Sequence, residues 1–275
     1  MRPAIHQTLY RYRTLTAQYR LLPDFIIIGA HKGGTTSLYN YLIAHPCIAP
    51  ALRKEVHFFD ENFGKGTIWY RAHFPSLVSK YYATRVRRQK FITGEATPYY
   101  IWHPVVPQRL SQTLPRAKLI AVLRNPVDRA YSQYHHQVRC GDETLSFEDA
   151  LAGEAEILAR DTEKILQNDY YSFKHYSYLS RGIYIGQLEA WGRFFSREQM
   201  LVLKSEELAA DPQATVRQVW EFLELPAWEL KKPREDHKAD YPEMSTNTRK
   251  RLIEFFRPHN KRLYEFLGVN FRWDP

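Results

Sequence analysis

The sequence predicts an α/β fold, a three-layer sandwich with a central parallel sheet. Three apolar runs, at residues 25–28, 118–123 and 200–203, are each followed by a helical pattern. The run at 118–123 is almost continuously apolar, which is typical of a strand buried on both faces of a parallel sheet. Strands that alternate with helices bury their side chains when helices cover both faces of one sheet.

Length and composition favour one large globular domain. The 275 residues are 44% hydrophobic and 25% charged, which is ordinary for a folded protein and argues against disorder. We expect an N-terminal extension over residues 1–22 and a single domain over residues 23–275. The net charge of +9 favours anionic ligands, nucleic acid or acidic surfaces without choosing among them.

The cysteine count and the apolar stretches indicate the cellular compartment. Cys47 and Cys140 are the two cysteines, which excludes a framework of several disulfides and suits a reducing compartment. No stretch approaches 18 apolar residues, and residues 1–22 lack the apolar segment of a signal peptide. We therefore expect no membrane span and a cytoplasmic location.

The first strand leads into a glycine-bearing loop. Residues 29–37 read Gly-Ala-His-Lys-Gly-Gly-Thr-Thr-Ser, and a helical pattern begins there and ends before Pro46. N–H groups at a helix N-terminus form an anion site, to which Lys32 adds a positive charge. The common P-loop of nucleotide triphosphatases needs lysine where this chain has Thr35. The loop is therefore predicted to be a relative of that P-loop that serves a different anion.

A polar loop at residues 54–60 precedes the next predicted strand, at 91–95, and Pro98 predicts a turn after it. Arg124 then follows the buried strand at 118–123. Asn125 is a suitable cap and Pro126 a suitable first residue for a helix that we expect to reach about His136.

The remaining third of the chain is mainly helical in pattern. Residues 141–180 resemble an insertion or lid with a helix at 147–158. Helices are also expected at 184–195 and after Asp211-Pro212, on either side of the strand at 200–203. The last segment predicts two short helices, 245–257 and 259–268, because Pro258 interrupts the pattern and Gly268 ends it.

Four motifs in this order resemble those of the sulfotransferase family. They are the loop at 29–37, Lys-Glu-Val-His-Phe-Phe-Asp at 54–60, Gly-Glu-Ala-Thr-Pro-Tyr-Tyr at 94–100, and the segment at 123–134 that begins Leu-Arg-Asn-Pro. The resemblance spans residues 23–268 and is nearest to the heparan sulfate sulfotransferase branch and its bacterial relatives. One departure is Ala96, because that branch usually has a lysine there, associated with the acceptor.

The resemblance implies the donor 3′-phosphoadenosine 5′-phosphosulfate, and a P-loop-like loop that binds its phosphosulfate. The implied donor-binding residues are Lys32, Gly33, Gly34, Thr35, Thr36 and Ser37 for the 5′-phosphosulfate, and Arg124 with Ser132 for the 3′-phosphate. Arg124 suits this role because open α/β sheets bind ligands at the carboxyl ends of their strands. The family's late donor-contacting loop is expected near residues 237–240, where its glycine-arginine pattern is not reproduced.

The implied reaction is sulfuryl transfer to a hydroxyl or amine of a carbohydrate or small-molecule acceptor. Lys32 would stabilise the charge on the departing phosphate. Glu55 would be the general base, with His57 as its rival. We expect both side chains to point into one cleft because residues 55 and 57 of an extended loop face the same way.

Two other functions are compatible with parts of the sequence. A nucleotide kinase or GTPase-like protein would share the glycine loop, and a nucleic-acid binder would share the positive charge. The displaced lysine argues against the first, and scattered basic residues argue against the second. No Cys/His spacing fits zinc, so we expect no metal.

Overall fold

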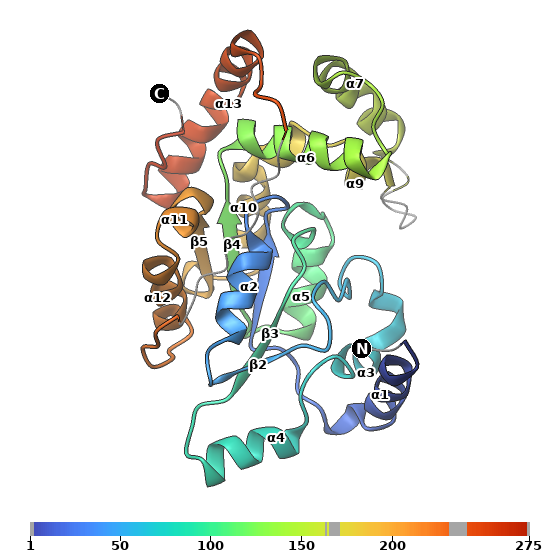
Figure 1. Ribbon diagram of the computed structural model, residues 1–275, viewed down its shortest axis with the longest axis vertical. Helices are drawn as coiled ribbons and strands as arrows, with labels where there is room; N and C mark the ends of the chain where they lie inside the picture. The colour runs from blue at the N-terminus through green and yellow to red at the C-terminus, as the bar shows by residue number, and fades with distance from the viewer. Residues whose placement is uncertain (1–2, 163, 165–170, 231–240, 274–275) are drawn as a thin grey trace.

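The computed structural model describes residues 3–162, 164, 171–230 and 241–273, and it is built on one five-stranded parallel sheet (Figure 1). The strands are β1 (Phe25–Gly29), β2 (Ile48–Pro50), β3 (Ile92–Ala96), β4 (Lys118–Leu123) and β5 (Met200–Lys204). Their order across the sheet is β2-β3-β1-β4-β5, and every neighbouring pair is parallel. The central parallel sheet predicted from the sequence is therefore confirmed.

Alternate residues of the central strands enter two different cores. Ile26 and Ile28 of β1 pack in one core with α5 (Val106–Thr113) and α10 (Tyr184–Gly192). Phe25 and Ile27 pack in the other with α2 (Thr35–Ile43), α11 (Ser205–Ala210) and α12 (Pro212–Phe222). Because side chains alternate along a strand, this division produces the three layers.

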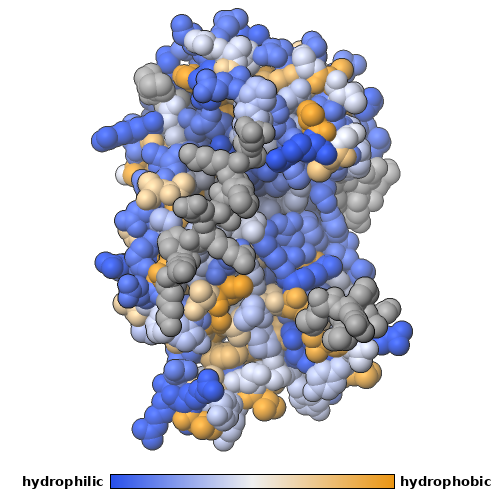
Figure 2. Space-filling model, in the orientation of Figure 1, coloured by the Kyte–Doolittle hydropathy of each residue, from blue (hydrophilic) through white to orange (hydrophobic). Residues whose placement is uncertain are grey.

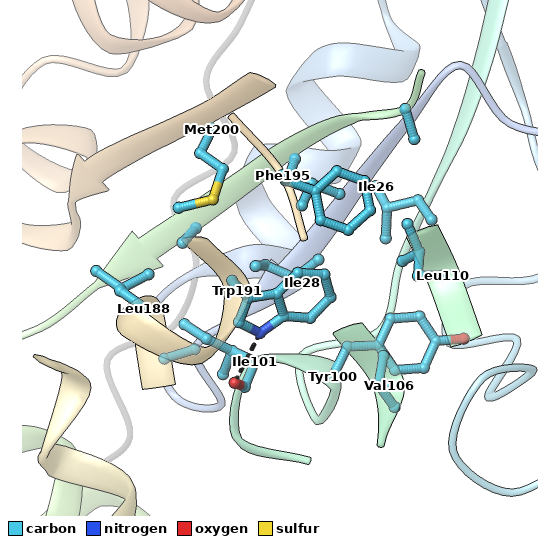
Figure 3. Close-up of a cluster of buried hydrophobic side chains, with 14 of the residues drawn as sticks. Ile26, Ile28, Tyr100, Ile101, Val106, Leu110, Leu188, Trp191, Phe195 and Met200 are labelled. Atoms are coloured by element: carbon cyan, nitrogen blue, oxygen red, sulfur yellow. Dashed lines mark hydrogen bonds between the residues drawn. The ribbon is translucent and has the colours of Figure 1, made fainter. Parts of the chain in front are cut away.

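Trp191 lies at the centre of the first core. Figure 3 shows its ring among aliphatic side chains of the sheet and of α10, with its Nε1 atom donating to the carbonyl oxygen of Ile101 at 2.9 Å. The hydrogen bond satisfies the polar atom of a fully buried indole. The loop after β3 is thereby attached to α10.

A further helical layer lies across the carboxyl end of the sheet (Figure 1). It contains α6 (Pro126–Cys140), α7 (Phe147–Arg160) and α9 (Tyr171–His175), and buried side chains of α6, α7 and α13 (Thr246–Leu267) form a third hydrophobic cluster. In the described part of 141–180, the predicted helical character is confirmed. A role as a lid stays a prediction.

The break predicted at Pro258 is wrong. Residues 246–267 form one helix, with the proline inside it. Leu252 and Phe256 before the proline and Leu263 after it are all buried, in two different cores. Packing on both sides of Pro258 therefore holds the helix together although the proline removes one backbone hydrogen bond.

The N-terminal segment packs against the domain. It contains α1 (Pro3–Leu15) and a 3-10 turn, Ala17–Tyr19. Arg13 donates to the carbonyl oxygens of Ala72 and Phe74 at 2.7 and 2.6 Å, beside α3 (Gly66–Arg71). The division at residue 22 stays a prediction.

The short helix α4 (Leu77–Tyr81) continues as a π-helical turn, Tyr82–Val86, at the lower end of Figure 1.

The other elements are short, and both cysteines are free, Cys47 buried and Cys140 exposed. The remaining 3-10 turns are Phe63–Lys65, Tyr100–Trp102, Ser180–Gly182 and Arg197–Gln199.

Candidate functional site

A cavity of about 850 Å³ opens at the carboxyl ends of β1 and β4. The chain leaves β1 toward β2 on one side of the sheet and leaves β4 toward β5 on the other, so these neighbours form the point at which open α/β sheets bind ligands. Seven of the ten predicted site residues line the cavity, namely Lys32, Gly34, Thr35, Thr36, Glu55, Arg124 and Ser132. Gly33, Ser37 and His57 lie beside it in the same segments.

Two glycines give the loop after β1 its shape. The N–H of Gly33 donates to the carbonyl oxygen of Ala30 at 2.9 Å, and a Cβ atom on Gly33 would lie 2.3 Å from the carbonyl oxygen of Val122. Gly34 has a φ of 92°, a conformation that side chains disfavour. The loop can therefore lie against β4 only with glycine at position 33.

The loop ends at a helix N-terminus that no side chain of the described residues caps. Gly34 is the N-cap residue of α2, and the N–H groups of the first turn begin at Thr35 on the cavity wall. Such N–H groups, aligned with the helix dipole, attract an anion. Thr36 is exposed and Ser37 is half-buried in the same turn.

Two basic side chains, Lys32 and Arg124, line this half of the cavity. Burial lowers the pKa of the Lys32 amine, and repulsion from Arg139 and Arg124 lowers it further. Within the described chain, Lys32 and Arg124 form no ion pair, although one guanidinium nitrogen of Arg124 lies 3.4 Å from the carbonyl oxygen of Lys32. Asp128 and Glu206 also line the cavity but pair with neither of them, and two neighbouring cations without an ion-pair partner favour an anionic ligand between them.

The turn that carries Arg124 is held from several sides. The Tyr184 hydroxyl donates to the Arg124 carbonyl at 2.9 Å, and the next N–H, of Asn125, donates to Glu206 at 2.8 Å. Asn125 then caps α6 as predicted, accepting from Val127 at 3.0 Å. Helix α6 carries Ser132, which is 5% exposed, to the cavity wall.

The loop that carries Glu55 and His57 is not extended as expected. Glu55 has a φ of 60° and His57 a φ of 54°, both in the left-handed region. Backbone hydrogen bonds account for the difference, because the N–H of Glu55 donates to the Ala96 carbonyl at 3.0 Å and that of Phe58 to the Tyr100 hydroxyl at 2.9 Å. The loop is tied to the end of β3 residue by residue.

A buried carboxylate, Glu95, supports this loop from below. Glu95 is fully buried and accepts from the hydroxyl of Tyr70 at 2.5 Å and from that of Thr97 at 2.7 Å. The N–H of Val56 lies 3.4 Å from its second oxygen. Burial raises the pKa of Glu95. Buried hydrogen-bonded networks of this kind fix the geometry of the groups above them.

Glu55 and His57 converge although the loop is folded differently. Nε2 of His57 lies 3.7 Å from one oxygen of Glu55, and Lys54 pairs with the other. Burial would raise the pKa of Glu55, but the hydrogen bonds from His57 and Lys54 outweigh it and lower the pKa to about 2. Glu55 lines the cavity as an ionised carboxylate.

The charge state of His57 follows from its other neighbours. Burial lowers the pKa of the imidazole, but hydrogen bonds to Asp60 and Glu55 outweigh burial and raise the pKa to about 9. Asp60 lies 2.7 Å from Nδ1 and is 4% exposed. His57 is therefore a cation at neutral pH, which makes it a poor proton acceptor.

Sequence reasoning missed three residues of the site, two of which line the cavity. Asp60 is in a recognised motif but had no predicted role, and its signal was the three-residue spacing from His57. His31 and Tyr99 line the cavity with their rings stacked, 5.0 Å between centroids, and Nδ1 of His31 is buried without a hydrogen-bond partner among the described residues. Burial, together with repulsion from Arg181 and Lys32, holds the pKa of His31 well below its usual value.

One group of side chains has metal-ligand geometry. Ligand atoms of His57, Asp60 and Glu61 lie within 4.8 Å of one another. The hydrogen bond between His57 and Asp60 satisfies both groups without an ion, and the expectation of no metal stays a prediction. The late loop expected near residues 237–240 lies outside the described residues.

Comparisons with known proteins agree with this geometry. A family model described as "Sulfotransferase domain" matches residues 22–262. The crystal structure of a sulfotransferase from Alicyclobacillus acidocaldarius is similar with a TM-score of 0.71 and 31% identity, over 93% of this chain and 100% of that chain.

Two curated relatives extend the comparison. Heparan sulfate glucosamine 3-O-sulfotransferase 3B1 of Homo sapiens is 32% identical over 92% of this chain and 65% of its own length. The membrane-associated sulfotransferase kil1 of Dictyostelium discoideum is 28% identical over 92% of this chain and 66% of its own length. The chain thus spans about two thirds of the length of these relatives. In the part of the chain that the structure describes, no helix is both long and apolar enough to cross a bilayer.

Proposed function

Because the chain belongs to the sulfotransferase family, we propose that it transfers a sulfuryl group from 3′-phosphoadenosine 5′-phosphosulfate to a hydroxyl or amine of a carbohydrate or small-molecule acceptor. The observation that carries the proposal is the division of one cavity into two halves. Lys32, Arg124 and a helix N-terminus form one half, with no ion pair or side-chain cap from the described residues, and the ionised Glu55 lies in the other.

The cationic half is proposed to bind the donor. Lys32 and the N–H groups that begin at Thr35 would hold the 5′-phosphosulfate, and Gly33 and Gly34 allow the backbone to approach it. Arg124 and Ser132, on the neighbouring strand end and on α6, would hold the 3′-phosphate. Phosphate groups at both ends of the nucleotide would then act as the counter-ions of Lys32 and Arg124.

Glu55 is proposed as the general base. It lines the cavity and is ionised at neutral pH, whereas His57 does not line it and is already protonated. His57 and Lys54 would instead orient the carboxylate. A carboxylate of low basicity is sufficient because the acceptor hydroxyl becomes strongly acidic as its oxygen bonds to sulfur.

The residues of the cavity account for every bond and proton of the proposed reaction. The acceptor oxygen forms a bond to sulfur, the bond from sulfur to the 5′-phosphate oxygen breaks, and the acceptor proton passes to Glu55. Charge accumulates on the departing phosphate, where Lys32 and the N–H groups of the first turn of α2 would stabilise it. The products are a sulfated acceptor and 3′-phosphoadenosine 5′-phosphate.

A carbohydrate acceptor is the first class to test, because heparan sulfate glucosamine 3-O-sulfotransferases are among the relatives. Ala96 is buried and ends β3, so the lysine usual in that branch is missing here. We therefore propose an acceptor that does not need a cation at this position. The nucleotide kinase or GTPase-like alternative is not favoured by the comparisons.

Two measurements test the proposal. Thermal unfolding should show a larger rise in Tm with 3′-phosphoadenosine 5′-phosphate than with ATP and magnesium, because a ligand that binds only the folded state stabilises it. Transfer of labelled sulfate from the donor should then be assayed over carbohydrates, phenols and amines. An equal or larger shift with ATP and magnesium would reject the donor, and transfer to none of the acceptors would reject the acceptor classes.

A further inference from the structure

The helix at residues 77–86 has its apolar side facing the solvent. Leu77, Val78, Tyr81, Tyr82 and Val86 are 47% to 73% exposed, whereas Lys80, Ala83 and Thr84 are half-buried. These five are a large share of the 17 exposed large hydrophobic side chains found among the described residues. A surface helix normally turns its apolar side to the core. The reversed arrangement indicates that something outside the domain covers this side.

Basic residues lie within this helix and directly after it in the sequence. Residues 77–90 contain five lysines and arginines and no acidic residue. Arg85, Arg87 and Arg88 are exposed and, within the described chain, form no ion pair, whereas Lys90 already pairs with Glu224. We call the exposed residues of 77–88 the basic apolar face.

The N-terminal segment meets the chain directly before this helix. Leu21 donates its N–H to the carbonyl oxygen of Pro75 at 2.9 Å, and Arg20 forms a β-bridge with Ser76, directly before the helix. Residues 1–22 contain no acidic residue, and Arg11 is exposed, whereas Arg20 is buried and Arg13 donates to the carbonyl oxygens of Ala72 and Phe74. Tyr12, Leu15 and Tyr19 are 58% to 82% exposed. The N-terminal segment therefore adds exposed apolar side chains and one exposed arginine close in the chain's path to the helix.

The basic apolar face is far from the cavity. It precedes β3 and so lies at the amino end of the sheet, at the bottom of Figure 1, while the cavity lies at the carboxyl ends below α6. Figure 2 shows strongly hydrophobic and strongly hydrophilic residues next to each other at this lower end. The donor and acceptor sites do not account for it.

We propose that the basic apolar face docks the protein on the surface of an anionic lipid bilayer. Tyrosine, leucine and valine side chains can enter the headgroup region, and arginines beside them attract acidic lipids. A second copy of the chain fits less well, because a two-fold contact would bring the same unpaired arginines together. An acidic polysaccharide would match the arginines but not the five exposed apolar side chains.

Docking at this end has a consequence for access. The cavity would face away from the bilayer, so a donor and an acceptor in solution could still enter. Binding to vesicles should therefore leave sulfuryl transfer to a water-soluble acceptor unchanged.

Co-sedimentation of the full chain with vesicles tests the proposal. We expect binding to phosphatidylcholine vesicles that contain about 30% phosphatidylserine and little binding to pure phosphatidylcholine. The variant Arg85→Gln/Arg87→Gln/Arg88→Gln and the variant Leu77→Ser/Val78→Ser/Tyr81→Ser should each reduce the partition coefficient about tenfold or more. Circular dichroism and thermal unfolding would show that both variants are folded.

Matched control variants show whether the location of the removed side chains matters, or only their number and kind. Lys250→Gln/Arg251→Gln/Lys261→Gln removes the same charge from exposed positions of α13, and Phe255→Ser/Phe266→Ser/Val269→Ser removes three exposed apolar side chains. Both controls should bind vesicles like the unmodified chain. Equal losses in controls and variants would overturn the proposal.

Two further results would also overturn it. One is a dimer in sedimentation velocity that the apolar variant dissociates, without vesicle binding by the unmodified chain. The other is binding to an acidic polysaccharide that the arginine variant loses while vesicle binding stays unchanged. None of these outcomes depends on the sulfuryl-transfer assay, so the two proposals fail independently.

Discussion

The imidazole of His57 donates through Nδ1 to the buried carboxylate of Asp60, 2.7 Å away. This contact orients the ring so that its second nitrogen faces Glu55 at 3.7 Å. Carboxylates on both sides keep the ring protonated, and the protonated ring in turn lowers the pKa of Glu55. The orientation and the basicity of the proposed base therefore depend on a residue that does not line the cavity.

Turnover should fall as the pH rises through about 9, the pKa of His57, because the neutral ring no longer attracts and orients the Glu55 carboxylate. The pKa of His57 is raised from 6.5, so the attraction between the protonated ring and Glu55 is fully present below pH 6.5 and is lost as the pH passes 9. Asp60→Asn removes a neighbouring negative charge and should move the alkaline limb of the kcat profile down by about one pH unit or more. A pH–rate profile of the two proteins checks this, and an unmoved limb would contradict the assigned role of Asp60.

Glu55→Gln should lower kcat by about 100-fold or more, because the amide cannot accept the acceptor proton. Donor affinity should stay within about twofold, since Glu55 is proposed to act on the acceptor and not on the nucleotide. Steady-state kinetics and calorimetry with 3′-phosphoadenosine 5′-phosphate measure the two effects. Glu254→Gln on the exposed side of α13 is the matched control, and near-normal turnover in Glu55→Gln would remove this residue from its role.

Arg124→Ala should abolish the preference for a nucleotide with a 3′-phosphate. A charge-assisted hydrogen bond contributes about 1.5–3 kcal/mol, so the Kd of 3′-phosphoadenosine 5′-phosphate should rise about 10- to 150-fold. The Kd of adenosine 5′-phosphate should change little, and Ser132→Ala should have a smaller effect of the same kind. Calorimetry with both nucleotides checks this, with Arg116→Ala as an exposed control. Equal losses for the two nucleotides would place the 3′-phosphate elsewhere.

Gly33→Ala should weaken donor binding and destabilise the fold by about 1–3 kcal/mol, because the added methyl group would overlap the Val122 carbonyl. Gly186→Ala, on α10 with open space around it, should instead be neutral or stabilising by about 0.5–1 kcal/mol. Urea unfolding and donor titration of both variants give the comparison. If the two substitutions behaved alike, the close approach of the loop to β4 would not matter for binding.

Four of the five strands and the loop after β1 could be predicted from the sequence because their signals are local. A continuous apolar run, a glycine turn and the Asn125 cap each depend on a few neighbouring residues. The strand β2, of three residues, has no such signal. Its parallel pairing with β3 joins residues that are more than 40 positions apart.

The predictions from sequence are wrong where contacts between distant residues outweigh the local conformational preference of the chain. Pro258 would end an isolated helix, but burial on both sides keeps α13 continuous. The loop at Glu55 and His57 has left-handed residues because hydrogen bonds from β3 and Tyr100 fix its backbone. The fully buried support of Glu95 could not be predicted, because a glutamate in a strand gives no signal of the hydroxyl groups that surround it.

The two halves of the cavity rest on different strands. Lys32 and Arg124 follow the ends of β1 and β4, and the Glu55 loop is hydrogen-bonded to the end of β3. The two halves touch where the His31 ring stacks on Tyr99, but the residues proposed for the nucleotide and the proposed base belong to different segments. On this proposal, substitutions on the β3 side would change the acceptor before they change the nucleotide. To change the acceptor by design, the Glu55 loop and β3 should therefore be exchanged together between homologues.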